Sequence, residues 1–525
     1  MLTKEGAGVM QWTMRLEMRT SAGELKTTEL VTFSRPAVIG TLAEVGLLPA
    51  ETKTLLARLQ ASMLCGQVAE YAAHHRACAA CGVLQPLKDR RTRWLQILFG
   101  TVEVEAPRFK MCRCRCSATQ ELARTVAPVC TLLTARCTPE LERLQAELGA
   151  RTSFRDAARI LETLLPASPA NQESVRNRTH AVALRIEAAD RQAATEATAV
   201  REPDEVAAAD EHRPIVMLYG AYIRTMPGHQ VRTFEAICGK VEHEGHPTRR
   251  FALVRSVAEQ PNALLRAALQ NQGWREGDAV TAISDGDPAL PALVRTATGG
   301  PVEHILDWFH LSMRLHHVEQ VMGGLCAVEL PPLAPLGHAQ IGVERRHLLW
   351  NGHHEKACEA LGRIVSGAKD AIVLNDPGSE AKARRLAARC TELRRYIENN
   401  KGALIDYGQR YRTGQPISTS RAESTVNQLV NARVNKRQQM HWSPRGAHRV
   451  LQVRAAVLDG RFGHQALRLA ASCPRFLTRF SAIRAWMSAQ RQRTTLSRAR
   501  SGPVRIQPAT SAYCSAARRA STPPP

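Results

Sequence analysis

The spacing of apolar positions changes along this chain and divides it into helical and strand-like regions. Between residues 138 and 195 apolar side chains recur every three or four positions, which predicts amphipathic helices. Between residues 214 and 309 short apolar runs are separated by turns, and from 311 to about 411 the helical spacing returns. Because a chain of 525 residues usually holds several domains, we predict a multidomain α/β protein.

The region from residue 210 to 465 is expected to form a mixed sheet with crossover helices, interrupted by an all-helical insertion at about 311–415. Three hairpin-length strands come first, and strands that alternate with helices follow. This order predicts antiparallel pairing among the first strands and crossover connections among the later ones. The strands are predicted at 214–223, 232–241, 250–255, 279–283 and 302–309, and the helices around them at 261–270, 288–296, 423–434 and 444–458.

Two smaller units are expected before the sheet. Residues 1–60 are predicted to be an N-terminal helical segment, because helix-like spacing runs from 44 to 60. Residues 61–120 are predicted to be a small module whose centre, 91–106, is a hairpin of two short strands that turns at Gly100.

The stretch 121–195 is expected to be a helical DNA-binding region. One helix begins at Thr138 and Pro139, with the threonine as cap and the proline in the first turn. Another begins near Asn171 after the break at 166–170, and it carries Arg176 and Arg178. A helix, a short break and a basic helix resemble a helix-turn-helix. The alternative is an ordinary helical hairpin, since most of these bind no DNA.

The charge of the chain indicates a polyanionic partner. The formal net charge is +23 and the isoelectric point is about 10.0, which favours DNA or RNA over an anionic membrane. After Asp459 the chain holds twelve arginines and no acidic residue, so 466–525 is predicted to be a basic, partly disordered tail. No apolar stretch is long enough to span a membrane and no secretion signal is visible, so we expect a cytoplasmic, nucleoid-associated protein.

Cysteine pairs on either side of the predicted hairpin suggest a structural zinc site. Cys78 and Cys81 have the usual two-residue spacing, whereas Cys112, Cys114 and Cys116 offer three thiols for two places. We assign zinc to Cys78, Cys81, Cys112 and Cys114, with Cys116 as an open alternative. Ordinary reduced cysteines are the competing interpretation.

Carboxylates in the predicted sheet region suggest metal-dependent chemistry on nucleic acid. Asp285 follows an apolar run directly, and Glu423 stands where a helical pattern begins. Carboxylates are the ligands with which proteins hold Mg²⁺ or Mn²⁺ for phosphodiester chemistry. Taken singly, each has a simpler interpretation, because Ser-Asp-Gly is usually a turn and a glutamate at a helix start often interacts with the helix dipole.

Several blocks of the chain, within about 60–465, resemble the ISKra-type insertion-sequence transposases. The resemblance implies a DDE transposase, whose ribonuclease-H-like core carries a helical insertion before its last acidic residue. The resembling blocks are Leu98-Phe-Gly-Thr-Val102, Thr233-Phe-Glu-Ala-Ile-Cys-Gly-Lys-Val241, Ser284-Asp-Gly286, Ile305-Leu-Asp-Trp-Phe-His-Leu-Ser-Met-Arg314, Arg421-Ala-Glu-Ser-Thr-Val-Asn-Gln428 and Gln438-Gln-Met-His-Trp-Ser-Pro-Arg-Gly-Ala-His448.

The resemblance implies roles for the acidic residues. Asp285 would be the second ligand of a Mg²⁺ or Mn²⁺ site and Glu423 the third. The position of the family's first aspartate holds Tyr219, in Leu218-Tyr-Gly-Ala-Tyr222, and a neutral phenol with a pKa of about 10 is a poor Mg²⁺ ligand. Asp307, His310 and Arg314 form a second polar group that could contact the scissile phosphate; helix capping and packing are the alternative.

The function implied is binding of the element's terminal inverted repeats and target DNA, with strand cleavage and transfer by at least a dimer. A catalytically inactive DNA-binding member of the family is the main alternative, and a nuclease acting on RNA or DNA junctions is a third. The basic segment 431–445 is expected to line the DNA groove unless it is only a solvated face. Its candidate contacts are Arg433, Lys436, Arg437 and Arg445.

Overall fold

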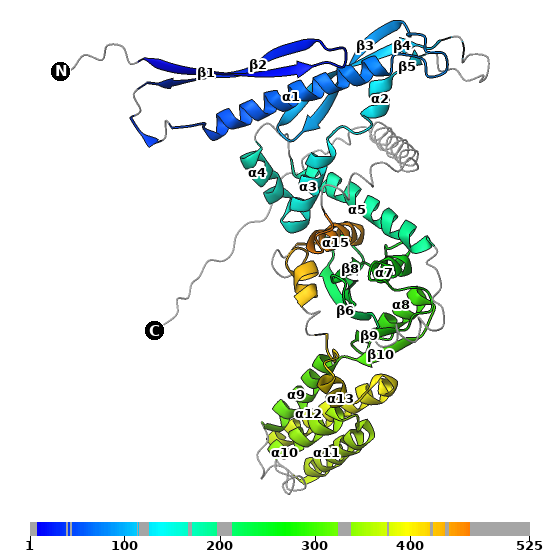
Figure 1. The fold of residues 1–525 in the computed structure, drawn as a ribbon. Helices are drawn as coiled ribbons and strands as arrows, with labels where there is room; N and C mark the ends of the chain where they lie inside the picture. Colours follow the sequence, from blue (N-terminus) through cyan, green and yellow to red (C-terminus); the bar gives the residue numbers. More distant parts are fainter. Residues whose placement is uncertain are drawn as a thin grey trace, which may run out of the picture. The chain divides into compact units, whose positions relative to one another are not determined.

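Helices and strands make up the described part of the computed structural model, with runs of helices on either side of a central sheet region (Figure 1). The structure describes residues 8–37, 40–42, 45–112, 114, 125–165, 171–196, 213–323, 338–374, 377–419, 424–435 and 440–462. All of them belong to the first of the two units into which the chain divides, Met1–Arg468. Glu423, Lys436, Arg437, Cys116 and the predicted tail at 466–525 lie outside the described residues.

A five-stranded mixed sheet forms the centre of the protein, as the sequence predicted. Its spatial order is β10-β9-β6-β7-β8. The hairpin-linked strands β6, β7 and β8 pair antiparallel, whereas β9 pairs parallel with both β6 and β10. The strands are β6 (Ile215–Arg224), β7 (Thr233–Glu242), β8 (Arg249–Leu253), β9 (Val280–Ser284) and β10 (Val302–Leu306).

Both faces of this sheet are covered, because side chains alternate between two hydrophobic clusters. On one face Val216 and Leu218 pack with the crossover helices α7 (Pro261–Gln270) and α8 (Ala289–Thr298). On the other face Met217 and Tyr219 join a larger cluster that includes the helices following β10. The sheet is therefore buried on both sides, and its polar groups emerge at the strand ends.

The predicted helical insertion is confirmed for the described residues, which form helices that pack side by side (Figure 1). In α12 the buried side chains Ala383, Leu386, Cys390, Leu393 and Ile397 recur at helical spacing and face α9 and α11. None of the helices in the described ranges is long and apolar enough to cross a bilayer. The helices are α9 (Trp308–Gly323), α10 (His338–Trp350), α11 (His354–Leu374), α12 (Pro377–Asn399) and α13 (Tyr407–Arg412), with a 3₁₀ turn at Lys401–Ala403.

The helices just before the sheet lie close to the predicted bounds and pack with one another; they are α3 (Pro139–Arg151), α4 (Phe154–Leu164) and α5 (Gln172–Thr195). Of these, α3 and α5 also pack with the last described helix, α15 (Pro444–Leu458), which contacts β8 as well. Ser153 caps α4 by accepting from the Asp156 amide at 3.0 Å, and Asn171 caps α5. Thr138 is the N-cap residue of α3 and Pro139 begins the helix, as predicted, although the threonine side chain makes no capping hydrogen bond.

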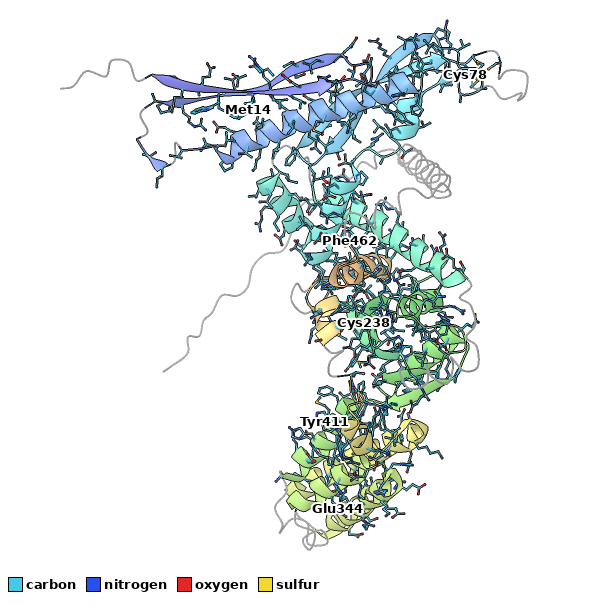
Figure 2. The ribbon with its side chains drawn as sticks, in the orientation of Figure 1. Met14, Cys78, Cys238, Glu344, Tyr411 and Phe462 are labelled. Atoms are coloured by element: carbon cyan, nitrogen blue, oxygen red, sulfur yellow. The ribbon has the colours of Figure 1, made fainter. Side chains whose placement is uncertain are left out.

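The prediction of a helical segment over 1–60 is wrong for its first half. Strands β1 (Val9–Arg19) and β2 (Leu25–Pro36) form an antiparallel hairpin, and helix α1 (Pro49–His74) follows. Met14 of β1 is labelled in Figure 2. The second hairpin is confirmed, because β3 (Leu87–Ile97) and β4 (Gly100–Lys110) pair antiparallel on either side of the predicted turn. Two short elements complete this part, β5 (Thr125–Val126) and α2 (Pro128–Leu132).

Arg433 lies inside the protein and not on a DNA-facing surface. Its side chain is fully buried, and its guanidinium carbon lies 5.0 Å from the ring centres of both Phe154 and Trp442. The Nε group donates to the carbonyl of Gly149 at 3.1 Å. Burial lowers the pKa of Arg433 to about 10. The prediction that Arg433 contacts DNA is therefore wrong for this structure, since the side chain joins α3 and α4 to the segment after the π-helical turn Asn427–Asn431.

Replacing Arg433 by alanine should lower the free energy of unfolding by about 2–4 kcal/mol, because it removes a buried side chain and two cation–π contacts. The measurement is urea denaturation of the purified protein. Arg395→Ala, on the exposed face of α12, serves as control and should change stability by less than about 0.5 kcal/mol. Equal losses in the two variants would contradict a structural role for Arg433.

Candidate functional site

Polar side chains from three neighbouring strands meet at one edge of the central sheet. The parallel pairing of β6 with β9 ends at Met217 and Ile283, two residues before Tyr219 and Asp285. The pairing of β9 with β10 ends at Ser284 and Leu306, and Asp307 is the next residue. Because parallel strands end at the same edge, the backbone places Tyr219, Asp285 and Asp307 side by side.

Asp307 is the centre of a buried hydrogen-bond network. Its side chain is fully buried, and Oδ1 accepts from the backbone amides of Phe309 and Thr419, each at 3.0 Å. Oδ2 accepts from Nδ1 of His310 at 2.7 Å and from the hydroxyl of Thr419. A buried carboxylate needs such donors, and these come from the start of α9 and from the chain after the insertion.

Tyr219 reaches the same network from β6. Its hydroxyl lies 3.5 Å from Oδ2 of Asp307 and in hydrogen-bonding contact with the Thr419 hydroxyl. The Thr419 hydroxyl has one proton, so it can donate to only one of these two partners at a time. The phenol is 6% exposed. Tyr219 is thus tied to Asp307 and largely shielded from solvent.

The network shifts the acidity of its members. Burial alone would raise the pKa of Asp307, but hydrogen bonds from His310 and Thr419 outweigh it and hold the pKa below its usual value. The hydrogen bond to Asp307 raises the pKa of His310 against burial, and the charges of Asp307 and Asp285 act in the same direction. Asp285 therefore lies close enough to the histidine for its charge to be felt.

Asp285 has acidic neighbours that the sequence analysis missed. Its Oδ1 accepts from the amide of Asp287 at 3.2 Å. Burial raises the pKa of Glu235 on β7, and the charges of Asp287 and Asp285 add to that shift. A Cβ added to Gly220 would lie 2.6 Å from the Glu235 carboxylate, so this side chain extends over β6. Glu235 stands in one of the blocks that carry the family resemblance, and this is the pattern that could have drawn attention to it.

These acidic groups do not by themselves fit a metal ion. In the ranges that the structure describes, the only set of three or more histidine, cysteine or acidic side chains close enough to share an ion is a cysteine group. Of the predicted Mg²⁺ ligands, Asp285 is half-buried at the strand end, and Glu423 lies outside the described residues.

Arg314 does not join the Asp307 network. It pairs with Glu392 at 3.2 Å, and its guanidinium carbon lies 4.2 Å from the centre of the Tyr396 ring. Tyr396 in turn packs on Gly286, since a Cβ on that glycine would lie 2.6 Å from the ring. Of the three predicted auxiliary residues, the structure therefore brings Asp307 and His310 together, whereas Arg314 is held by α12.

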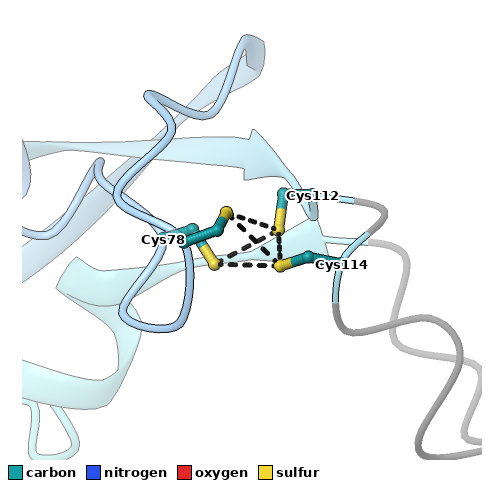
Figure 3. A group of neighbouring side chains, drawn as sticks. Cys78, Cys112 and Cys114 are labelled. Atoms are coloured by element: carbon teal, nitrogen blue, oxygen red, sulfur yellow. Dashed lines mark hydrogen bonds between the residues drawn. The ribbon is translucent and has the colours of Figure 1, made fainter.

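The four cysteines assigned to zinc converge in the module around β3 and β4 (Figure 3). All four sulfur atoms lie within 4.8 Å of one another. The Sγ atoms of Cys78 and Cys114 are 3.6 Å apart, as are those of Cys81 and Cys112. A tetrahedron with zinc–sulfur bonds of about 2.3 Å has edges of about 3.8 Å. The group could therefore hold a metal ion such as zinc.

Local backbone structure brings the first cysteine pair into position. The chain turns back on itself after Cys78. The Cys78 amide donates to the Val83 carbonyl at 2.9 Å, and the Gly82 amide donates to the Cys78 carbonyl at 2.8 Å. Gly82 has φ +70°, a conformation that glycine adopts without strain. A hydrogen bond with Cys112 lowers the pKa of Cys78 to about 6. Thiolates are the form in which cysteine binds metals.

The remaining predicted DNA contacts are divided between surface and interior. Arg176 is exposed on α5 and pairs with Glu173. Arg178 is half-buried and donates to the side chains of Gln145 and Gln96, so it joins α5 to α3 and β3. Arg445 is exposed in the first turn of α15. Arg176 and Arg445 are therefore accessible to a polyanion, whereas Arg178 is engaged within the protein.

Comparison with known proteins identifies no family for this chain: no protein-family model matches it, and neither does any curated protein.

The pH dependence of stability should reflect the pair of Asp307 and His310. Because the pKa of His310 is raised above 6.5, its contribution is fully present below pH 6.5 and is lost as pH rises through the raised pKa. The pKa of Asp307 is lowered, so its contribution to the free energy of unfolding is present above the ordinary pKa of an aspartate. That contribution is lost only as the pH falls through the lowered pKa. His310→Gln should therefore flatten the stability profile just above pH 6.5, measured by urea unfolding across pH. His347→Gln, which changes an exposed histidine, should leave the profile unchanged, and a profile unaffected by His310→Gln would disprove the coupling.

Metal analysis of purified protein should find about one ion per chain at the cysteine group. Cys78→Ser and Cys112→Ser should each abolish binding and lower the thermal midpoint, because the ion links the two ends of the hairpin module. Cys65→Ser is the matched control, since Cys65 is an exposed thiol of α1 outside the group. Absence of metal from the wild type, or its retention in both ligand variants, would rule out the site.

Proposed function

We propose that this protein is a DNA-binding transposase of the DDE class, built on a ribonuclease-H-like core, that acts on the terminal inverted repeats of an insertion sequence. The observation that carries the proposal is the strand order together with its polar ends. Taken in chain order, the strands stand 3-2-1-4-5 across the sheet, with the second antiparallel to the rest. The resemblance assigns its first two site positions to Tyr219 on β6 and to Asp285 directly after β9. Each of them stands two residues beyond the last pair of these strands, Met217 and Ile283.

DNA binding is supported by charge that is accessible on several elements. The net charge is +23, and Arg176 and Arg445 are exposed on helices that pack together. Phosphate contacts of this kind position a protein on DNA without reading its sequence. The cysteine group would hold zinc as a structural ion that stabilises the small N-terminal module. A dimer or larger assembly is expected, since paired transposon ends are cut together in this class.

Strand cleavage in this class depends on Mg²⁺ or Mn²⁺, which lowers the cost of charge on the attacking and leaving oxygens. Asp285 is the described residue that would serve as ligand, and the resemblance assigns a second to Glu423. We expect His310, whose Nδ1 lies 2.7 Å from Oδ2 of Asp307 and whose pKa is raised, to contact a phosphate near Asp285.

A second candidate function, DNA binding without cleavage, is favoured by the surroundings of Tyr219. Its hydroxyl is buried and contacts Thr419 and Asp307, so it presents no anionic oxygen to a metal. An inactive copy would keep the fold and the basic surface and would act through DNA binding alone.

A cleavage assay on duplex carrying the element's end, with Mg²⁺ or Mn²⁺, separates the two functions. If the wild type cuts, Asp285→Asn should reduce the rate by at least about 10²-fold, since one metal ligand is lost. Asp278→Asn changes a buried aspartate just before the start of β9, at the other end of this strand from Asp285, and serves as control. Wild-type protein that binds but does not cut, with cleavage gained in Tyr219→Asp, supports the inactive copy. Undiminished cutting by Asp285→Asn would refute the assigned site.

A further inference from the structure

A groove between α9 and α12 is lined by basic side chains and has no role in the function proposed so far. Its volume is about 450 Å³. His317 and Gln320 line it from α9, and Lys382, Arg385 and Arg389 from α12. These five residues are exposed. Among the described residues that line the groove, Val321 is the only apolar one, so basic and polar side chains make up most of this lining.

Helix geometry explains why the charges gather there. Lys382, Arg385 and Arg389 each stand one position before a buried residue of α12, so they form a continuous row beside the helix–helix seam. Arg384 and Arg394 lie on the other side of the buried row, where they pair with Glu380 and Glu398. The basic row of the groove is thus a feature of one side of α12 only.

Facing charges leave the groove positive. Glu392 is the carboxylate at its inner end, and it pairs with both Arg314 and Arg389. Glu319 of α9 pairs with Arg346 and contacts His316 instead. Within the described residues Arg385 and His317 make no hydrogen bond or ion pair. Among the described residues, Glu392 is therefore the one carboxylate paired with arginines of this seam, Arg314 and Arg389.

The basic row leads toward the strand-end site. Arg314, Arg389 and Glu392 line a second, smaller hollow next to the groove. Arg314 then stacks on Tyr396, which packs against Gly286 beside Asp285. From Lys382 to Arg389 the helix rises about 10 Å at 1.5 Å per residue. A DNA strand carries one phosphate per about 3.4 Å, so the row spans about three consecutive phosphates.

We propose that this groove binds the phosphate backbone of the DNA that flanks the Asp285 site. The inference rests on the proposed function and deepens it, because it gives the helical insertion a part in holding DNA. Guanidinium groups suit this partner, since their fixed pattern of donors fits phosphate oxygens. The length of the row favours an extended polyanion over a single small anion.

The test compares two double variants of the full chain that remove equal charge from the same helix. Arg385→Gln/Arg389→Gln changes the groove, and Arg384→Gln/Arg394→Gln changes the opposite side. Each is titrated against a fluorescein-labelled 30-base-pair duplex over a range of NaCl concentrations. The groove variant should bind about ten-fold more weakly and lower the slope of log Kd against log[NaCl] by about two, as expected for two lost phosphate contacts. The control should stay within about two-fold of the wild type.

Other outcomes overturn the inference in distinguishable ways. Equal loss in both variants, or loss in neither, rejects the groove while leaving DNA binding by the protein intact. A wild type with no affinity for the duplex rejects both the groove and the proposed function. If poly-glutamate displaces the duplex from the wild type as well as unlabelled DNA of equal charge does, the partner is not DNA. A wild type that binds but never cuts affects only the catalytic proposal.

Discussion

The buried carboxylate of Asp307 is the constraint on which the arrangement of the strand-end site depends. An ionised group without solvent requires donors on each oxygen, and here these donors come from parts of the chain that are far apart in sequence. Phe309 and His310 lie at the start of the insertion, Thr419 lies beyond its end, and Tyr219 belongs to the first strand of the sheet. The chain therefore leaves the sheet for the insertion and returns to the sheet at one point, which the Asp307 side chain fixes.

The same constraint explains what a tyrosine can do at position 219. An aspartate there would bring a second negative charge toward Asp307, and like charges in a buried place raise each other's pKa unless a cation lies between them. A neutral phenol avoids this repulsion and makes hydrogen bonds with Thr419 and Asp307 instead. The substitution is thus compatible with a well-packed core.

The sheet and most helices could be predicted from local patterns, because the apolar period is set by the burial of each element. The strands near Tyr219 and Asp285 and the helix at Pro261 follow this rule, as does the spacing of the cysteine pairs. The first hairpin was missed although Met10, Trp12 and Met14 alternate with polar residues, a strand pattern overlooked beside the stronger helical spacing that follows. Contacts between distant residues could not be predicted. Thr419 is 112 positions from Asp307 and 200 from Tyr219, and no local period encodes such pairs.

The arginines show the same limit of prediction from sequence, because their accessibility is not encoded in the composition. A net charge of +23 predicts a polyanionic partner, yet composition does not tell which cations are accessible. Arg433 is fully buried between aromatic rings, and Arg454 donates to the Ala150 carbonyl at 2.7 Å. Arg249 pairs with Asp190 at 3.2 Å, and its side chain is 7% exposed. Such groups stabilise the fold and contribute little to the field outside it. Other cations, such as Arg385 and Arg389 of α12, are exposed, so the direction of a side chain around its helix decides its role more than its position in a basic segment does.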